Sequence, residues 1–250
     1  MTLPQFIIRD ELSPGTIFPL PRPVFTHAVK SMRLAAGEQM ILSDGEGHRA
    51  VVTLLDETSG TVQVGDVEEV DEPEVRLGLI QALAKSGRDE QAIEMATEVG
   101  VDAVMPWQAQ RSIVQWKGAK AEKALSKWRD LLTAATEQSR RSRMPELLSL
   151  HTTKQLISWT RERTEAGDVV LVLHQDATET WGQFEDVVRA VQRGTIWVVV
   201  GPEGGITDDE VAALKDAGAH ALVIGQNILR ASSAGPVALT LLSRVMGRYE

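Results

Sequence analysis

Cysteine is absent from the 250 residues of the chain, and histidine occurs only five times. Without cysteine the protein has no disulfide framework, no thiolate metal site and no cysteine nucleophile. The histidines are scattered without the spacing of metal ligands. No apolar run approaches the roughly 20 residues that cross a bilayer, and the N-terminus lacks the pattern of a secretory signal. We therefore expect a soluble cytoplasmic protein with no metal centre and no membrane partner.

Positive charge is also scarce, since 26 Lys and Arg stand against 35 Asp and Glu and give a net charge of −9. Indiscriminate binding to nucleic acid needs many cations to neutralise phosphates, so this balance argues against it. The distribution is uneven, however, because residues 105–163 carry +7 and the remainder carries −16. A basic middle on an acidic molecule fits a localised anionic partner. A solvated helix face rich in Lys and Arg is the alternative.

The C-terminal part of the chain holds the densest series of small-residue turns. Ile196–Val200 is a continuous apolar run that predicts a buried strand, and it ends at the loop Gly201–Gly205. Adjacent glycines let the backbone approach a ligand closely. Thr207 and Glu210 then form the pattern of a capping box, which predicts a helix that runs to Gly218.

A second short strand is predicted at Ala221–Ile224, and it ends at Gly225. Ile228–Arg230 leads into a small-residue turn, and a final helix is predicted from about Pro236. In open α/β sheets, ligands bind at the carboxyl ends of strands, where these turns lie. The turns are either parts of a binding site or ordinary strand-to-helix connections, and their close succession favours a site.

Residues 1–72 have the pattern of a separate small β domain. Short runs with partial alternation are separated by turn residues, a spacing typical of a small barrel. Between them, Val24–Leu34 predicts a short helix that places His27, Lys30 and Arg33 on one polar face, which is either solvated or in contact with phosphate. The predicted strands are Gln5–Ile8, Gln39–Ser43, His48–Leu55 and Gly60–Val70.

A polar, proline-interrupted segment at residues 70–74 is the best candidate for a linker. Beyond it, the chain alternates strand and helix, which is the signal of a doubly wound α/β domain, placed here at residues 73–250. Its predicted elements include a strand at Val75–Leu83, a helix at Asp89–Val99, a strand at Val101–Met105 that ends at Pro106, a strand at Val169–Leu173 and a helix at Trp181–Val191.

A long amphipathic helix is predicted at Lys120–Ser139, and the densest basic cluster follows it at Arg140, Arg141 and Arg143. Cations at a helix C-terminus interact favourably with the helix dipole. Three arginines in four residues exceed that need, and the guanidinium fork suits phosphate. The cluster therefore favours RNA contact over a purely structural role.

These motifs together resemble the RsmE family of 16S ribosomal RNA uridine-N3 methyltransferases, in the SPOUT class with its C-terminal trefoil knot. The family's GPEGG stands at Gly201–Gly205, its LG at Ile224-Gly225 and its ILR at Ile228–Arg230, whereas its following acidic position is Ser232 here. Agreement runs from about His27 to the end of the chain. It includes Arg33 and Gly37, Lys85 and Arg88, Ala96–Val101, Pro106 with Arg111-Ser112, Lys127-Trp128, Glu137–Arg140 and Met144-Pro145.

The resemblance implies a PUA-like β-barrel RNA-binding domain at residues 1–72, a SPOUT methyltransferase domain at residues 73–250, and S-adenosylmethionine as methyl donor. The implied partners are the 16S rRNA of the small ribosomal subunit and a second copy of the chain. The implied cofactor site comprises Leu173, His174, Gly201, Pro202, Glu203, Gly204, Gly205, Ile224, Gly225, Gln226, Ile228, Leu229 and Ser232. The implied RNA contacts are His27, Lys30, Arg33, Lys85, Arg88, Arg111, Arg140, Arg141 and Arg143.

In the implied reaction, uracil N3 loses a proton, and a fixed cation stabilises the anion that develops. We assign this role to Arg230, with a structural arginine as the alternative. Ser232 or Ser233 bonds the base or the cofactor carboxylate, and Ser233 is assigned to the catalytic set. His174 is either a base or a hydrogen-bonded side chain. The functions left open are a SPOUT methyltransferase acting on tRNA or 23S rRNA, an inactive RNA-binding assembly factor and, last, a small-molecule α/β enzyme.

Overall fold

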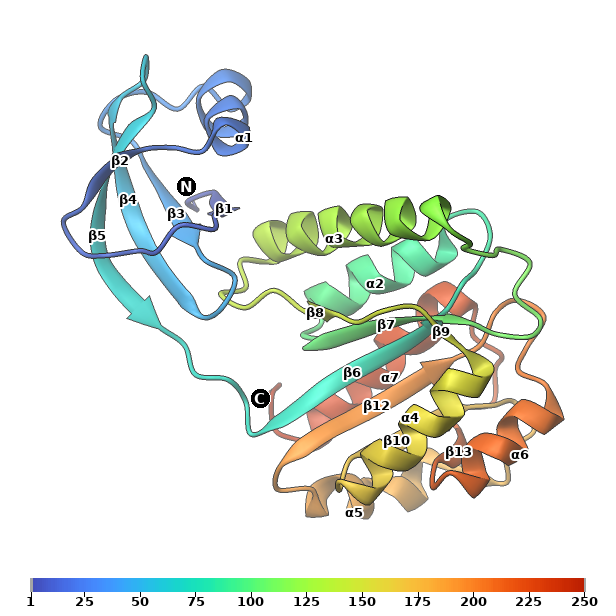
Figure 1. Ribbon diagram of the computed structural model, residues 1–250. Coiled ribbons are helices and arrows are strands. Elements are labelled where there is room, and N and C mark those ends of the chain that lie inside the picture. Colours follow the sequence, from blue (N-terminus) through green and yellow to red (C-terminus); the bar gives the residue numbers. More distant parts are fainter. Residues whose placement is uncertain (1, 250) are drawn as a thin grey trace. The chain divides into compact units, whose positions relative to one another are not determined.

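The computed structural model describes residues 2–249, which form two compact units. Unit 1 comprises residues 2–72 and 133–144, and unit 2 comprises residues 73–132 and 145–249. Figure 1 traces the elements of both units along the chain. Across the described residues, no helix combines the length and the apolar character needed to cross a bilayer.

Unit 1 is built on one sheet with the strand order β1-β3-β4-β5-β2, in which β1 runs parallel to β3 and the other neighbours are antiparallel. Its buried face is made by alternate residues of the long strands, such as Val52 and Leu54, together with Val24 and Ala28. The elements are β1 (Gln5–Ile7), β2 (Ile17–Pro19), α1 (Arg22–Phe25), the π-helix η1 (Thr26–Ser31), β3 (Gln39–Ser43), β4 (His48–Asp56) and β5 (Thr61–Glu69).

The sequence predicts four of these strands within one residue of their observed bounds. It gives no sign of β2, because three residues beside prolines show no alternation. The predicted helix at Val24–Leu34 begins earlier, at Arg22, and continues as η1.

Segment 133–144, the end of α3 (Ala119–Ser139) and the turn after it, packs with the strands of unit 1. The Glu137 carboxylate accepts a hydrogen bond from the backbone N–H of Ile7 at 2.8 Å, so it satisfies a donor on the open edge of β1. The Gln5 amide donates to the carbonyl of Arg141 at 2.6 Å. The strand edge is therefore closed by a segment that is distant in sequence.

Unit 2 contains a sheet with the order β11-β13-β10-β12-β6-β7-β8, and every pair in it is parallel. Parallel sheets are stable when both faces are covered. Helices α2 and α7 pack together over β6 and β12, while α4 and α6 pack together over β10 and β13. Figure 1 shows these helices on the two faces of the sheet. The strands are β6 (Val75–Ala82), β7 (Ala103–Gln108), β8 (Glu146–Leu147), β9 (His151–Thr152, paired with β7), β10 (Val169–Leu173), β11 (Glu179–Thr180), β12 (Gly194–Val200) and β13 (His220–Val223), and the helices are α2 (Arg88–Glu98), α4 (Thr153–Glu165), α5 (Trp181–Ala190), α6 (Asp208–Asp216) and α7 (Ala231–Val245).

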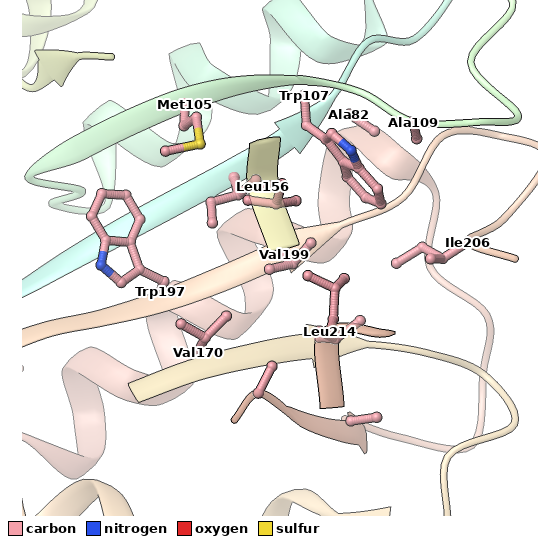
Figure 2. Packing of buried hydrophobic residues seen from close by; sticks show 14 of the residues in the cluster. Ala82, Met105, Trp107, Ala109, Leu156, Val170, Trp197, Val199, Ile206 and Leu214 are labelled. Carbon is pink, nitrogen blue, oxygen red and sulfur yellow. The ribbon is translucent and has the colours of Figure 1, made fainter. Parts of the chain in front are cut away.

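The core between the sheet and α4 and α6 is rich in large side chains. Figure 2 shows Trp197 and Trp107 toward opposite ends of this layer, with Leu156 and Val199 between them. Trp197 packs edge-on against Trp159 of α4, with ring centres 4.8 Å apart. The apolar runs predicted as buried strands thus form the centre of the unit.

Two predicted boundaries are wrong, and both were placed at a proline. Pro106 lies inside β7 rather than after it. It is tolerated because the neighbouring strands β8 and β9 pair with β7 at residues 103–104 and 107–108, which leaves Pro106 opposite a gap. Pro236 lies inside α7, which begins at Ala231. The residues predicted as a turn before Pro236 therefore form the first helical turn.

A substitution of Asp168, which lies just before β10, tests how much the hydrogen bonds of its carboxylate stabilise the sheet of unit 2. Its side chain is 2% exposed and accepts hydrogen bonds from the Thr195 N–H at 2.9 Å, the Trp197 Nε1 at 3.0 Å and the Arg163 Nε at 2.6 Å. Each carboxylate oxygen faces groups that can only donate. Asp168→Asn turns an amide N–H₂ toward one of them, and we expect it to lower the free energy of unfolding by roughly 2–3 kcal/mol.

Urea unfolding followed by fluorescence measures this change. The exposed Asp186→Asn on α5 is the control, and we expect it to change stability by less than about 0.5 kcal/mol. Equal effects of the two substitutions would contradict the role of the Asp168 contacts.

Candidate functional site

The loops after β10, β12 and β13 enclose a cavity of about 520 Å3 at the carboxyl edge of the unit 2 sheet. Every residue predicted for the cofactor site lines this cavity except Ser232. Arg88 and Arg111, which the sequence assigns to RNA, also line it, as does Arg230. The lining residues from the predicted set are Leu173, His174, Gly201, Pro202, Glu203, Gly204, Gly205, Ile224, Gly225, Gln226, Ile228 and Leu229.

The loop Gly201–Gly205 needs glycine for steric reasons that the structure makes visible. Gly205 has φ +75°, a left-handed conformation that side chains disfavour. A Cβ on Gly204 would lie 3.0 Å from the Cβ of Arg111. The Arg111 guanidinium donates to the Gly204 carbonyl at 3.0 Å. The loop after β7 and the glycine loop are therefore in direct contact at the rim of the cavity.

Glu203 joins the same loop to the turn after β6. Its carboxylate accepts a hydrogen bond from the Lys85 backbone N–H at 3.1 Å and pairs with the Arg88 guanidinium at 3.2 Å. The Glu203 side chain is 18% exposed, so the pair is largely shielded from solvent. Arg88 is consequently held at the cavity by a carboxylate of the glycine loop.

Helix α6 begins directly after the glycine loop, with Thr207 as its N-cap and Glu210 at the third helical position. This confirms the predicted capping box. The Glu210 carboxylate also accepts hydrogen bonds from the Gln110 N–H at 2.8 Å and the Thr153 hydroxyl at 2.7 Å. Burial alone would raise the pKa of Glu210, but its hydrogen bonds outweigh burial and lower the pKa below the usual glutamate range. The sequence reveals only the local half of this arrangement.

Arg230 occupies the N-cap position of α7 and is exposed at the cavity. Within residues 2–249 its guanidinium makes no hydrogen bond or ion pair. The Ser233 hydroxyl donates to the Arg230 carbonyl at 3.2 Å, and Ser232 is 8% exposed. Neither serine lines the cavity: both lie in the first turn of α7, which lines the cavity with Ala231 and Ala234 instead.

The candidate RNA contacts in unit 1 include two aromatic-anchored side chains on η1. The His27 ring packs edge-on against Phe6, with ring centres 5.3 Å apart. The Lys30 ammonium lies 5.0 Å from the centre of the Phe25 ring. Both side chains pack against aromatic rings at the border of the unit 1 core, and both residues are exposed, so their polar ends are accessible.

Arg33 and Arg140 share an unusual backbone conformation, with φ of 61° and 56°. Each follows the end of a helix, at the position where glycine is the usual residue. Both are exposed. Arg143 differs, because its Nε and Nη2 donate to the Val70 carbonyl at 3.0 and 2.8 Å. The basic cluster therefore contains one arginine that is bonded to the backbone of unit 1 and one whose side chain is available to a ligand.

No group of three or more His, Cys, Asp or Glu side chains that could hold a metal ion occurs within the described part of the chain.

Comparisons with known proteins cover almost the whole chain. An RNA methyltransferase domain family matches residues 71–243, and an RNA methyltransferase PUA domain family matches residues 20–67. The ribosomal RNA small subunit methyltransferase E of Mycobacterium tuberculosis is 42% identical over 226 residues, which cover 90% of this chain and 85% of that protein. The protein of the same name from Bacillus subtilis is 27% identical, with 95% and 93% covered.

Solved structures that are similar over almost their whole length include two with a bound cofactor. The ribosomal RNA small subunit methyltransferase E of Neisseria gonorrhoeae, bound to S-adenosylmethionine, has a TM-score of 0.85 and 25% identity, with 98% of each chain covered. A methyltransferase of Legionella pneumophila in complex with the same cofactor gives the same three values.

Proposed function

Because the chain belongs to the family of ribosomal RNA small subunit methyltransferases E, we propose that it methylates N3 of one uridine in the 16S rRNA of the small subunit. The protein is an S-adenosylmethionine-dependent methyltransferase. The observation that carries the proposal is the cavity at the carboxyl edge of the sheet, where the glycine loop, two neighbouring loops and an unpaired arginine meet. The base and the position of methylation rest on the family resemblance.

The residues of the cavity fit the cofactor. A volume of about 520 Å3 is in the range of pockets that hold molecules of this size. Half-buried Leu173, Ile224 and Leu229 offer apolar surface to an adenine ring, and the glycine loop offers backbone amides and carbonyls. When bound, S-adenosylmethionine supplies an electrophilic methyl group on a sulfonium.

The chain's own residues then orient the base and stabilise charge. The N3 proton of uracil has to leave, and negative charge develops on the base. Arg230 lies at the rim of the cavity, and its guanidinium has no partner among the described residues, so we assign it the stabilisation of that charge. Ser233 supports Arg230 through its hydrogen bond to the Arg230 carbonyl. Holding the base in line with the methyl group contributes several kcal/mol, up to about 7–11 in ideal cases.

We further propose that the loops around the cavity are tied in a trefoil knot and that two copies of the chain pair through α7. The family resemblance supports both statements. The strand order supports the first, because β13 follows β12 in the chain but lies on the far side of β10. The exposed Val237 on α7 supports the second.

The proposal is tested with labelled S-adenosylmethionine and three substrates: assembled small subunits, naked 16S rRNA and bulk tRNA. Mass spectrometry then identifies the modified base. We expect N3-methyluridine in 16S rRNA, from assembled subunits, naked RNA or both. Label in tRNA, or on another base, would show that the protein uses the cofactor and that the proposed target is wrong.

Arg230→Ala tests the proposed cation. Loss of a preorganised charge at a developing anion costs about 10²–10³ in kcat. We therefore expect kcat to fall by about that factor, while the Kd of S-adenosylmethionine, measured by calorimetry, changes less than about threefold. The control is Arg193→Ala, an exposed arginine that lies directly before β12 and outside α7, and it should leave kcat unchanged. Methylation at the full rate by Arg230→Ala would remove this residue from catalysis.

Arg33→Gly and Arg140→Gly test RNA contact without disturbing the fold. Glycine adopts the left-handed conformation at no steric cost, so each variant should be at least as stable as the wild type. If each guanidinium binds one phosphate, RNA affinity falls about fivefold at 0.15 M salt and the salt slope decreases by about one. Filter binding at several salt concentrations measures both quantities.

Ser86→Gly is the matched control for these two variants. Ser86 has φ of 60° and carries no charge, so glycine relieves the same conformation without removing a cation. RNA affinity equal to that of the wild type in the arginine variants would exclude the proposed contacts.

A further inference from the structure

Glu210 is a buried carboxylate beside the cavity that does not line it. Its exposed fraction is 4%. One oxygen accepts from the Gln110 N–H at 2.8 Å and the Thr153 hydroxyl at 2.7 Å. The other accepts from the Thr207 N–H and hydroxyl, both at 3.0 Å. This one side chain therefore connects the loop after β7, the start of α4 and the end of the glycine loop.

Two of the connected segments meet at the cavity. Gln110 is followed by Arg111, whose guanidinium donates to the Gly204 carbonyl at 3.0 Å. Thr207 lies two residues beyond Gly205 and ends the same loop at the N-terminus of α6. Glu210 thus fixes the backbone on both sides of the Arg111–Gly204 contact.

Capping alone does not explain a glutamate at this position. The described residues contain two other capping boxes, at the starts of α4 and α5, and both have glutamine at the third helical position. Those glutamines, Gln155 and Gln183, bond to their own N-cap residues. A glutamine at position 210 fits less well, because each Glu210 oxygen accepts from a backbone N–H, which can only donate. A glutamine side chain has one oxygen and one N–H₂ group, so one of these two backbone N–H groups would face the N–H₂ and lose its acceptor.

We propose that Glu210 is a positioning residue that clamps Arg111 onto the glycine loop and holds the loop in its cofactor-binding shape before S-adenosylmethionine arrives. The primary role of Arg111, which the family resemblance assigns to RNA contact, is then to hold the glycine loop of the cofactor site. The proposal rests on the cofactor part of the proposed function and is independent of the RNA target. A loop that is ordered in advance binds more tightly, because less conformational entropy is lost on binding.

The experiment measures S-adenosylmethionine binding by calorimetry in Glu210→Gln, Arg111→Ala and the double variant. We expect each single variant to weaken binding about tenfold, and the double variant to be little weaker than either. Hydrogen exchange of the Gly204–Ile206 amides in cofactor-free protein is the second readout. We expect exchange there to be about tenfold faster in both single variants.

Asp168→Asn is the matched control, since it makes the same chemical change at a buried carboxylate before β10 and away from the cavity. It should lower stability and leave both the Kd and the exchange of the glycine loop unchanged. Thr153→Val, which removes one of the four hydrogen bonds, provides a milder variant should Glu210→Gln fail to fold. It should shift both readouts in the same direction.

Unchanged affinity and exchange in the Glu210 and Arg111 variants would overturn the clamp, as would additive effects in the double variant. Equal weakening by Asp168→Asn would show that affinity follows global stability and would overturn it too. A wild-type protein that binds no S-adenosylmethionine would instead overturn the cofactor site. The exchange rates of the cofactor-free loop would still decide whether Glu210 and Arg111 hold it.

Discussion

Helices cover both faces of the unit 2 sheet, and this constraint places the candidate site at an edge of the sheet. From Thr195 to Val200, every residue of β12 is buried, and the strand has a parallel neighbour on each side. Such a strand has no side chain to offer a ligand along its length, so only its ends are accessible. The loops after β10, β12 and β13 therefore meet at one edge, and the cavity lies there.

Local sequence patterns were sufficient for most elements of this unit. Val169–Leu173 is observed with the bounds that its apolar run predicts, and the capping box of Thr207 and Glu210 is formed as predicted. The two wrong boundaries depended on tertiary context. Pro106 continues a strand because its neighbours leave a gap, and Pro236 continues a helix, where it is buried. The free-energy cost of a proline in a strand or helix can be read from the local sequence, whereas the tertiary contacts that make the proline tolerable come from segments that the local pattern does not show.

The candidate site follows the same division. The glycine loop and its neighbours were recognisable as motifs, and their residues line the cavity. Ser232 does not line it, whereas Ala231 and Ala234 of the same helical turn do, a difference that the turn predicted from the sequence could not show. The bonds of Glu210 to Gln110 and Thr153 span 100 and 57 residues, so no spacing rule could find them. The sequence itself shows only that the third helical position of α6 is a glutamate, whereas the same position of α4 and α5 is a glutamine.

Two buried carboxylates at opposite edges of the same sheet make similar hydrogen bonds but have different roles. Asp168 and Glu210 each accept hydrogen bonds from donors in several segments. In each, both carboxylate oxygens face donors, so the N–H₂ of an amide side chain would meet donors at one of the two positions. Asp168 lies where β10 begins, so its bonds join strands that are already fixed by their ladder. Glu210 follows the carboxyl end of β12, where the backbone leaves the ladder and is held by side-chain contacts instead. The same chemistry therefore supports the core at one edge of the sheet and holds a loop that lines the cavity at the other.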